Sequence, residues 1–369
     1  MGVIRPETRA QAERRTELDI GKGIAVLLMI CVHVQEMYSQ PTVQKSMFGY
    51  TVELLTTFPA APLFMFAMGV GAVYSRRQDA AYAVSRGGAL LLTAFLLNAL
   101  RGYVPWSLGL KAGLLSMEAI PYGNVTLSLL EVDILHFAGL SFILIGGLRA
   151  IKAPWGAYPV VAILLGLLNY LVRGISTGNP AVDSLLGLLW GAGDTSYFPF
   201  LSWVFYPLAG VAFGTLLRRC EDKHRFYLRS LLLGCVAFFI SAWLDDFRLL
   251  HYLGIPEAYA YYHHDLLGNI FIGSLTLIWL SSLYLLQGAF PAAVLQRLQV
   301  WSRNLTTIYL IHWVLIGWFA LLVGFNQMSY WQTLLAMAVL VVASDRAAAH
   351  VPLTNRTELF SRIRRNSHA

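Results

Sequence analysis

Residues 15–33 read RTELDIGKGIAVLLMICVH. Between Ile20 and Val34 only Lys22 and His33 interrupt an apolar run, whose length approaches the ~20 residues that an α-helix needs to cross a bilayer core. Comparable runs recur along the 369-residue chain, which is 57% hydrophobic and only 13% charged. This composition excludes most classes of soluble protein. It predicts an all-α, polytopic integral membrane protein.

We expect ten transmembrane helices with both termini in the cytoplasm. The predicted spans are residues 19–38, 51–74, 83–100, 132–149, 154–172, 198–217, 226–244, 266–286, 303–324 and 331–350. They form one ten-helix transmembrane domain, residues 19–350, between a cytoplasmic segment, 1–18, and a basic cytoplasmic tail, 351–369. Of the 27 Lys and Arg residues, 21 lie on the side of the N-terminus, which the positive-inside rule assigns to the cytoplasm.

The net charge of +7 therefore reflects topology and does not indicate a nucleic-acid partner. The first span is long enough to be retained in the membrane. We expect an integral protein of the bacterial cytoplasmic (inner) membrane, surrounded by the lipid bilayer. The sequence leaves the oligomeric state open, a homodimer included.

Ionisable side chains inside spans are costly and commonly mark functional sites. His33 follows Lys22 by eleven residues, and in an α-helix the rotation between them is about 20° from a whole number of turns. Both side chains therefore lie on one face of the helix, about 16 Å apart along its axis. This arrangement suits an acyl-coenzyme A thioester that enters from the cytoplasm, with Lys22 at its phosphates and His33 at the thioester. Alternatively, Lys22 reaches the interface and pairs with Asp19, while His33 binds a neighbouring helix.

Two further histidines lie within predicted spans. Asp133 precedes His136 by three residues, so the pair is either a carboxylate that orients a general base or a helix N-cap. Tyr309 precedes His312 by the same interval. His33, His136 and His312 lie on three helices that could line one cavity. No HxxxH spacing joins them, so we expect no metal.

Three long outer segments, 101–131, 173–197 and 245–265, contain Gly, Pro, aromatic and acidic residues. Such loops are common sites of recognition. The last of them carries four Tyr and three His, which either stack on sugar rings or form an interfacial aromatic belt.

Six short motifs occur in order along the chain. They are RxxELDxxKGxAxxxMxxxH (residues 14–33), FPAAPLFMFAMG (58–69), DILHFAGL (133–140), GNPAVD (178–183), YFPFLSW (197–203) and YLIH (309–312). Together they resemble the heparan-α-glucosaminide N-acetyltransferase catalytic-domain family, which is related to the type 3 membrane acyltransferases. Lys22 stands where many members have Arg, and Lys meets phosphate as a point charge without a bidentate fork.

The resemblance implies a transmembrane acyltransferase that moves an acetyl group from cytoplasmic acetyl-CoA to an extracytoplasmic sugar or glycan acceptor. It implies that His33 is the general base or the acyl carrier. The other site residues that we expect are Asp133 and His136 for catalysis, Lys22, Asp19, Tyr309 and His312 for the donor, and Asn179 and Asp183 for the acceptor. N- and O-acylation both remain open.

A membrane transporter or flippase for a small polar or lipid-linked substrate is the alternative, because it too would place polar residues at the midplane. Transporters commonly show inverted repeats and paired broken helices, and the two halves of this chain show no convincing correspondence. A membrane sensor would not need a cation and a histidine aligned along one helix.

Overall fold

The computed structural model describes residues 15–248 and 261–351, and within these ranges the chain is helical, with two isolated β-bridges and no named strand. The all-α prediction is confirmed. The predicted terminal segments up to residue 14 and from residue 352, and residues 249–260 of the third outer segment, lie outside the described residues.

The longer elements have the following bounds: α2 (Thr16–Tyr38), α4 (Met47–Thr57), α5 (Ala61–Tyr74), α6 (Ala80–Asn98), η1 (Ala99–Tyr103), α7 (Val104–Lys111), α8 (Ile134–Ala150), α9 (Ala157–Val172), α10 (Pro180–Trp190), α12 (Phe205–Arg219), α13 (Lys223–Leu244), α15 (Leu266–Leu286), α16 (Ala292–Arg303), α17 (Leu305–Val323) and α18 (Tyr330–His350). Short helical turns, α3 (Pro41–Gln44), α11 (Phe200–Trp203), η2 (Met117–Ala119), η3 (Pro121–Gly123), η4 (Val125–Leu130) and η6 (Gln287–Ala289), connect them.

Seven described segments are long and apolar enough to span a membrane by length and composition. They are Met47–Tyr74, Ala80–Lys111, Phe200–Arg219, Lys223–Leu244, Leu266–Ala289, Leu305–Val323 and Tyr330–His350. Three shorter apolar helices, α8, α9 and α10, accompany them. Helix α2 contains the first predicted span, residues 19–38, but is not among the seven. The total of ten spans and the side of the termini remain predictions.

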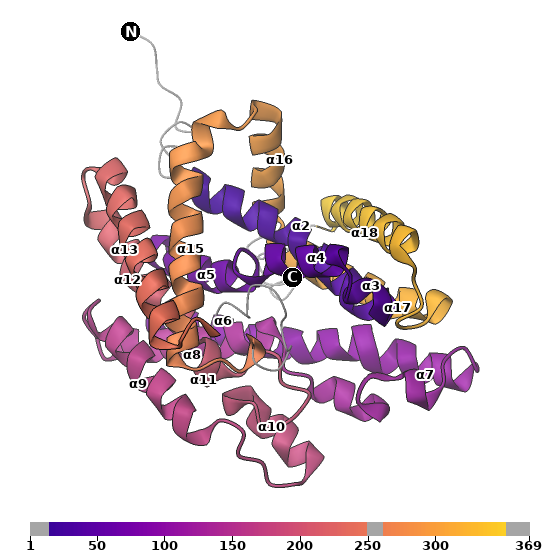
Figure 1. Ribbon diagram of the computed structural model, residues 1–369. Helices are drawn as coiled ribbons and strands as arrows, with labels where there is room; N and C mark the ends of the chain where they lie inside the picture. The colour runs from indigo at the N-terminus through magenta and orange to yellow at the C-terminus, as the bar shows by residue number, and fades with distance from the viewer. Residues whose placement is uncertain (1–14, 249–260, 352–369) are drawn as a thin grey trace, which may run out of the picture.

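Helix α2 runs through the middle of the molecule, between α15 and α16 on one side and α17 and α18 on the other (Figure 1). Its first turns are tied to α16, because the Ser302 hydroxyl donates to Asp19 Oδ1 over 2.5 Å. Its last turn is tied to α17, because the Tyr38 hydroxyl donates to the Ile316 carbonyl over 2.5 Å. The helix is therefore fixed at both ends, and the polar side chains between them have defined positions.

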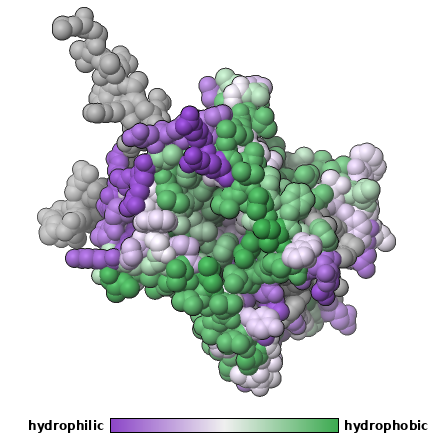
Figure 2. Space-filling view, turned by 60° about the vertical axis from the view of Figure 1, so that its left-hand side comes forward, coloured by the Kyte–Doolittle hydropathy of each residue, from purple (hydrophilic) through white to green (hydrophobic). Residues whose placement is uncertain are grey.

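Small residues let other helices approach closely, as is typical of membrane proteins. A Cβ atom on Gly69 of α5 would lie 2.0 Å from the Pro207 carbonyl oxygen of α12, and one on Gly210 would lie 2.1 Å from the Phe66 carbonyl oxygen. The surface of the assembled helices is broadly apolar between two hydrophilic edges (Figure 2). This pattern fits a bundle that is surrounded by lipid.

The first two outer segments are more helical than the loops that the sequence suggested. Helix α6 continues through the π-helical turn η1 into α7 and ends at Lys111, and three short 3₁₀ turns follow. The second segment contains α10, and α16 precedes the predicted ninth span. Some polar residues in these stretches bond within the protein, among them Arg101, Asn124 and Asp183.

Candidate active site

His33 of α2 and His312 of α17 form a pair near the centre of the molecule. His33 Nδ1 lies 3.0 Å from His312 Nε2. The Trp313 ring stacks on His33 with centroids 4.2 Å apart. His312 is fully buried, whereas His33 is partly exposed. Two of the three histidines that the sequence selected therefore meet.

The backbone fixes which nitrogen of this pair can act as a base. His312 Nδ1 lies 3.1 Å from the Ile308 carbonyl oxygen, which only accepts hydrogen bonds, so this nitrogen carries the proton. In the neutral ring, His312 Nε2 then accepts from His33 Nδ1–H. The lone pair of His33 is consequently on Nε2, the nitrogen that faces away from His312.

His312 should therefore act as a positioning residue for His33. We expect His312→Ala to lower kcat for acetyl transfer about 100-fold, because the unpaired His33 ring can then adopt the wrong tautomer or orientation. The KM for acetyl-CoA should change less than threefold. His312→Gln, whose amide oxygen can accept from His33 Nδ1–H, should recover part of the loss. Steady-state kinetics of the three proteins measure both constants, and equal kcat values in all three would rule out this role.

A buried charged network adjoins the histidine pair. Asp133 Oδ2 accepts from Arg101 Nη1 and from the Tyr309 hydroxyl, each over 2.6 Å. Arg101 also forms a very short ion pair with Glu131, and its guanidinium lies 4.2 Å from the centre of the Trp313 ring. The carboxylate of Asp133 is thus saturated, and it holds Arg101 and Tyr309 in place beside the histidines.

Asp133 and His136 form the helix N-cap that was one of the two interpretations of this motif. Asp133 Oδ1 accepts from the Ile134 N–H over 2.6 Å, and the Asp133 N–H donates to His136 Nδ1 over 3.3 Å, which is a capping box at the start of α8. His136 Nε2 has no partner among the described atoms, and the ring packs edge-on against Phe95 with centroids 4.6 Å apart. His136 is connected to the histidine pair through other residues: it accepts from the Asp133 N–H, the Asp133 carboxylate accepts from Tyr309, and the Tyr309 ring packs against His312.

A cavity of about 300 Å³ extends from Lys22 toward the histidine pair. Three cations, Lys22, Arg86 and Arg303, line this cavity together with Leu135 and Tyr309. The Tyr309 ring packs edge-on against His312, with centroids 5.4 Å apart. We call this space the Lys22 cavity.

Lys22 also pairs with Asp19 Oδ1 at 3.3 Å, as the alternative interpretation of the sequence expected. The two interpretations are compatible, because the paired ammonium still lines the Lys22 cavity. Helix α2 is unbroken from Thr16 to Tyr38, so the expected axial distance of about 16 Å between Lys22 and His33 applies.

Asn179 and Asp183 lie in a locally closed turn at the start of α10. Asn179 Oδ1 accepts from the Ala181 N–H over 3.1 Å and caps the helix. Asp183 accepts from the N–H of Thr177 and of Gly178, over 2.6 and 3.0 Å, and these bonds hold its pKa below the ordinary value. The structure does not bring either side chain to the histidine pair, since each bonds within its own turn.

Beyond His33, acidic and tyrosine side chains gather on the side away from Lys22. We define the outer carboxylate–tyrosine cluster by its members: Glu36, Glu53, Glu131, Tyr122, Tyr197 and Tyr262. The Tyr122 hydroxyl oxygen lies 2.8 Å from the Tyr197 hydroxyl oxygen and 3.3 Å from Glu131 Oε2, and it donates its single proton to one of them. Tyr197 and Tyr262 pack edge-on, with centroids 5.1 Å apart. Tyr262 and Glu53 lie next to Glu36, which is exposed and stands one turn beyond His33.

The remaining described residues of the third outer segment are mostly structural. The Tyr261 hydroxyl donates to the Thr57 carbonyl over 2.6 Å. His264 is fully buried and bonds to Tyr206 and Asn269. Neither the sugar-stacking nor the interfacial-belt interpretation describes these two residues, although Tyr262 does face the outer cluster.

The sequence did not indicate several residues of this site. Arg101, Trp313 and the outer carboxylates were missed, and Arg86 and Arg303 counted only as cytoplasmic charges. Glu36 offered a usable signal, because it follows His33 by three residues on a helix. Within the described ranges, no group of three or more His, Cys, Asp or Glu side chains could hold a metal ion.

A comparison with known families bears on this geometry. The family model described as heparan-alpha-glucosaminide N-acetyltransferase, catalytic, matches residues 14–255, about two thirds of the chain. The matched range includes His33, Arg101 and Asp133, while Tyr309 and His312 follow it in sequence. No curated protein matches the chain significantly.

Proposed function

This chain belongs to the heparan-α-glucosaminide N-acetyltransferase catalytic family, and from that premise we propose that it transfers an acetyl group from cytoplasmic acetyl-CoA to an extracytoplasmic amino sugar. Membership makes it a membrane acyltransferase. One observation supports the proposed donor and acceptor: Lys22 and Tyr309 line the same cavity. The Tyr309 ring contacts His312, and His312 pairs with His33.

The chemistry of the Lys22 cavity suits the donor. The three cations that line it offer counter-charges for the phosphates of coenzyme A. The walls beyond them are formed largely by apolar side chains, including Phe64, Met68 and Leu135, against which a pantetheine arm can pack. A thioester that follows this path approaches Tyr309 and the histidine pair.

In the proposed reaction, the acceptor ammonium first releases one proton to the outer solvent, and the nitrogen of the resulting neutral amine attacks the thioester carbonyl carbon. A C–N bond forms, the C–S bond breaks, and the electron pair of that bond leaves with the coenzyme A sulfur. His33 Nε2 takes the proton from the attacking nitrogen and returns it to the thiolate, so the products are an acetamide and free coenzyme A. In the two-step variant, His33 Nε2 carries the acetyl group between donor and acceptor.

The outer carboxylate–tyrosine cluster favours an amine over a hydroxyl acceptor. Gln35 Nε2 donates to Glu53 over 3.2 Å, and Arg101 pairs with Glu131, which leaves Glu36 as the exposed carboxylate nearest to His33 along α2. An amino sugar is cationic near neutral pH, so it favours the ionised form of this carboxyl group and pairs with it, whereas a neutral sugar offers no counter-charge. Tyrosine hydroxyls and rings nearby can bind the sugar hydroxyls and faces.

The function is tested by transfer from radiolabelled acetyl-CoA in proteoliposomes that contain glucosamine or glucose. We expect acetylated glucosamine, at least tenfold less acetylated glucose, and stoichiometric release of free coenzyme A. Glu36→Gln should raise the KM for glucosamine several-fold and leave the KM for acetyl-CoA unchanged. Equal transfer to both sugars would exclude the amine preference. A folded protein that transfers to neither, and that moves sugar across the membrane instead, would favour the transporter alternative.

We expect Lys22→Ala to raise the KM for acetyl-CoA about tenfold and to change kcat little, because one phosphate contact is lost outside the reacting centre. Initial rates at saturating acceptor measure this change. Arg225→Ala is the matched control, because Arg225 pairs with Asp222 on the surface of α13. An unchanged KM in Lys22→Ala would mean that Lys22 only pairs with Asp19 at the membrane interface.

A further inference from the structure

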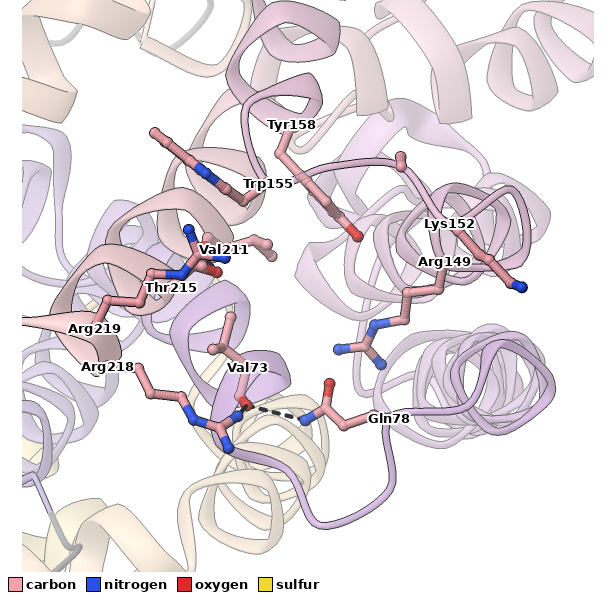
Figure 3. A pocket seen from close by; sticks show the side chains of 11 residues that line it. Val73, Gln78, Arg149, Lys152, Trp155, Tyr158, Val211, Thr215, Arg218 and Arg219 are labelled. Carbon is pink, nitrogen blue, oxygen red and sulfur yellow. Dashed lines mark hydrogen bonds between the residues drawn. The ribbon is translucent and has the colours of Figure 1, made fainter.

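A second cavity, of about 650 Å³, lies near the ends of α5, α8 and α12 and the start of α9. Figure 3 shows Arg149, Arg218, Arg219 and Lys152 around it, together with Trp155 and Tyr158. Arg149 and the Tyr158 hydroxyl reach inward, whereas the Lys152 ammonium points away at the rim. We call this space the basic pocket.

The charge of the basic pocket is not compensated within the described part of the chain. None of the residues that line it is acidic, and none of its four cations lies within 4 Å of a carboxylate there. Arg149 donates to the Ala72 carbonyl over 2.8 Å, and Arg218 donates weakly to the Val73 carbonyl over 3.4 Å. Each guanidinium has five N–H donors, so most of them remain available to an anion.

The position of the pocket indicates a ligand that belongs to the membrane. It lies at the end of the bundle where the sequence predicts the cytoplasmic interface. Trp155, a residue type that is enriched at membrane interfaces, is 38% exposed at its edge. From this point α9 presents an exposed apolar face that includes Val160, Leu164 and Leu167. Acyl chains can lie along that face while a headgroup occupies the basic pocket.

The basic pocket is separate from the Lys22 cavity. The last turn of α5 stands between them, because Ala72 lines the Lys22 cavity and Val73 lines the basic pocket. The Lys22 cavity has its own three cations for a nucleotide donor. We propose that the basic pocket binds the phosphate headgroup of an anionic membrane lipid, with the guanidinium groups on the phosphate and the acyl chains along α9.

Native mass spectrometry of the detergent-solubilised full chain tests this proposal. Phosphatidylglycerol, phosphatidylcholine, inorganic phosphate and coenzyme A are titrated separately. We expect wild-type protein to bind phosphatidylglycerol more tightly than phosphatidylcholine. The double variant Arg218→Gln/Arg219→Gln should lose about tenfold in affinity for phosphatidylglycerol, while Arg225→Gln/Arg229→Gln, which removes the same charge from α13, should lose none.

Several results would overturn the proposal. An equal loss in both double variants would mean general charge attraction, and equal binding of the two lipids would exclude headgroup selection. A loss of coenzyme A affinity without a loss for phosphatidylglycerol would assign the basic pocket to the donor. Binding of inorganic phosphate as tight as that of phosphatidylglycerol would assign it to a free anion. The single variant Arg219→Gln is the control for misfolding. The Arg219 side chain is exposed and makes no hydrogen bond or ion pair with other described residues, so this substitution should leave the fold intact.

Discussion

Replacing His33 with alanine should lower kcat for acetyl transfer on the order of 1,000-fold while acetyl-CoA still binds. The expectation follows from the tautomers of the two histidines. The Ile308 carbonyl keeps the His312 proton on Nδ1, so His312 Nε2 accepts from His33 Nδ1–H, and the lone pair of His33 is on Nε2. Along α2, His33 stands between Lys22, which lines the Lys22 cavity, and Glu36 of the outer carboxylate–tyrosine cluster. Loss of a positioned base or acyl carrier commonly costs 10²–10⁴-fold in rate.

Single-turnover transfer and donor binding by calorimetry separate the two parts of this prediction. Cys31→Ala is the matched control, because Cys31 is a partly exposed residue two positions earlier on the same helix. A His33→Ala protein that binds acetyl-CoA and retains more than a tenth of the wild-type rate would exclude His33 as the base. Rapid acid quench before the acceptor is added distinguishes the mechanisms, since acetyl label on the wild-type protein that His33→Ala lacks would indicate the two-step route.

The sequence predicted helix α2 and the common face of Lys22 and His33 because both follow from the period of a single helix. It also selected Tyr309, His312 and Asp133, since polar side chains in apolar spans are few. It could not predict that His312 meets His33 or that Asp133 binds Tyr309. Those contacts depend on how helices far apart in the chain pack, which in this molecule is governed by small residues such as Gly69.

At two other places the structure shows local contacts that the sequence pattern did not reveal. Asn179 and Asp183 belong to a motif that also suits a helix cap, and in the structure they close the turn before α10. Arg101 was placed in an outer loop because it follows an apolar run. The π-helical turn η1 instead continues the helix, and a Cβ on Gly317 would lie 1.7 Å from the Arg101 carbonyl oxygen, so glycine is what allows α17 to pack there.

Arg101→Met should destabilise the protein by about 3–5 kcal/mol, the usual effect of breaking a buried ion pair from one side. Arg101 is 4% exposed and forms ion pairs with both Glu131 and Asp133. Without it, two carboxylates remain in a low-dielectric region with no counter-charge. Arg101→Lys should be milder but still destabilising, because an ammonium cannot form both bonds with the fork of a guanidinium. Thermal unfolding in detergent measures the effect, with Lys111→Met, an exposed cation of the same helical segment, as the control.

The cause of that loss can be separated from simple loss of packing. If uncompensated charge destabilises Arg101→Met, the triple variant Arg101→Met/Glu131→Gln/Asp133→Asn should regain much of the stability, since removing all partners of a buried ion pair is often nearly neutral. Acetyl transfer should not return with it, because Asp133→Asn weakens the bond that holds Tyr309 beside His312. A triple variant that unfolds as readily as Arg101→Met would assign the effect to packing of the guanidinium on Trp313.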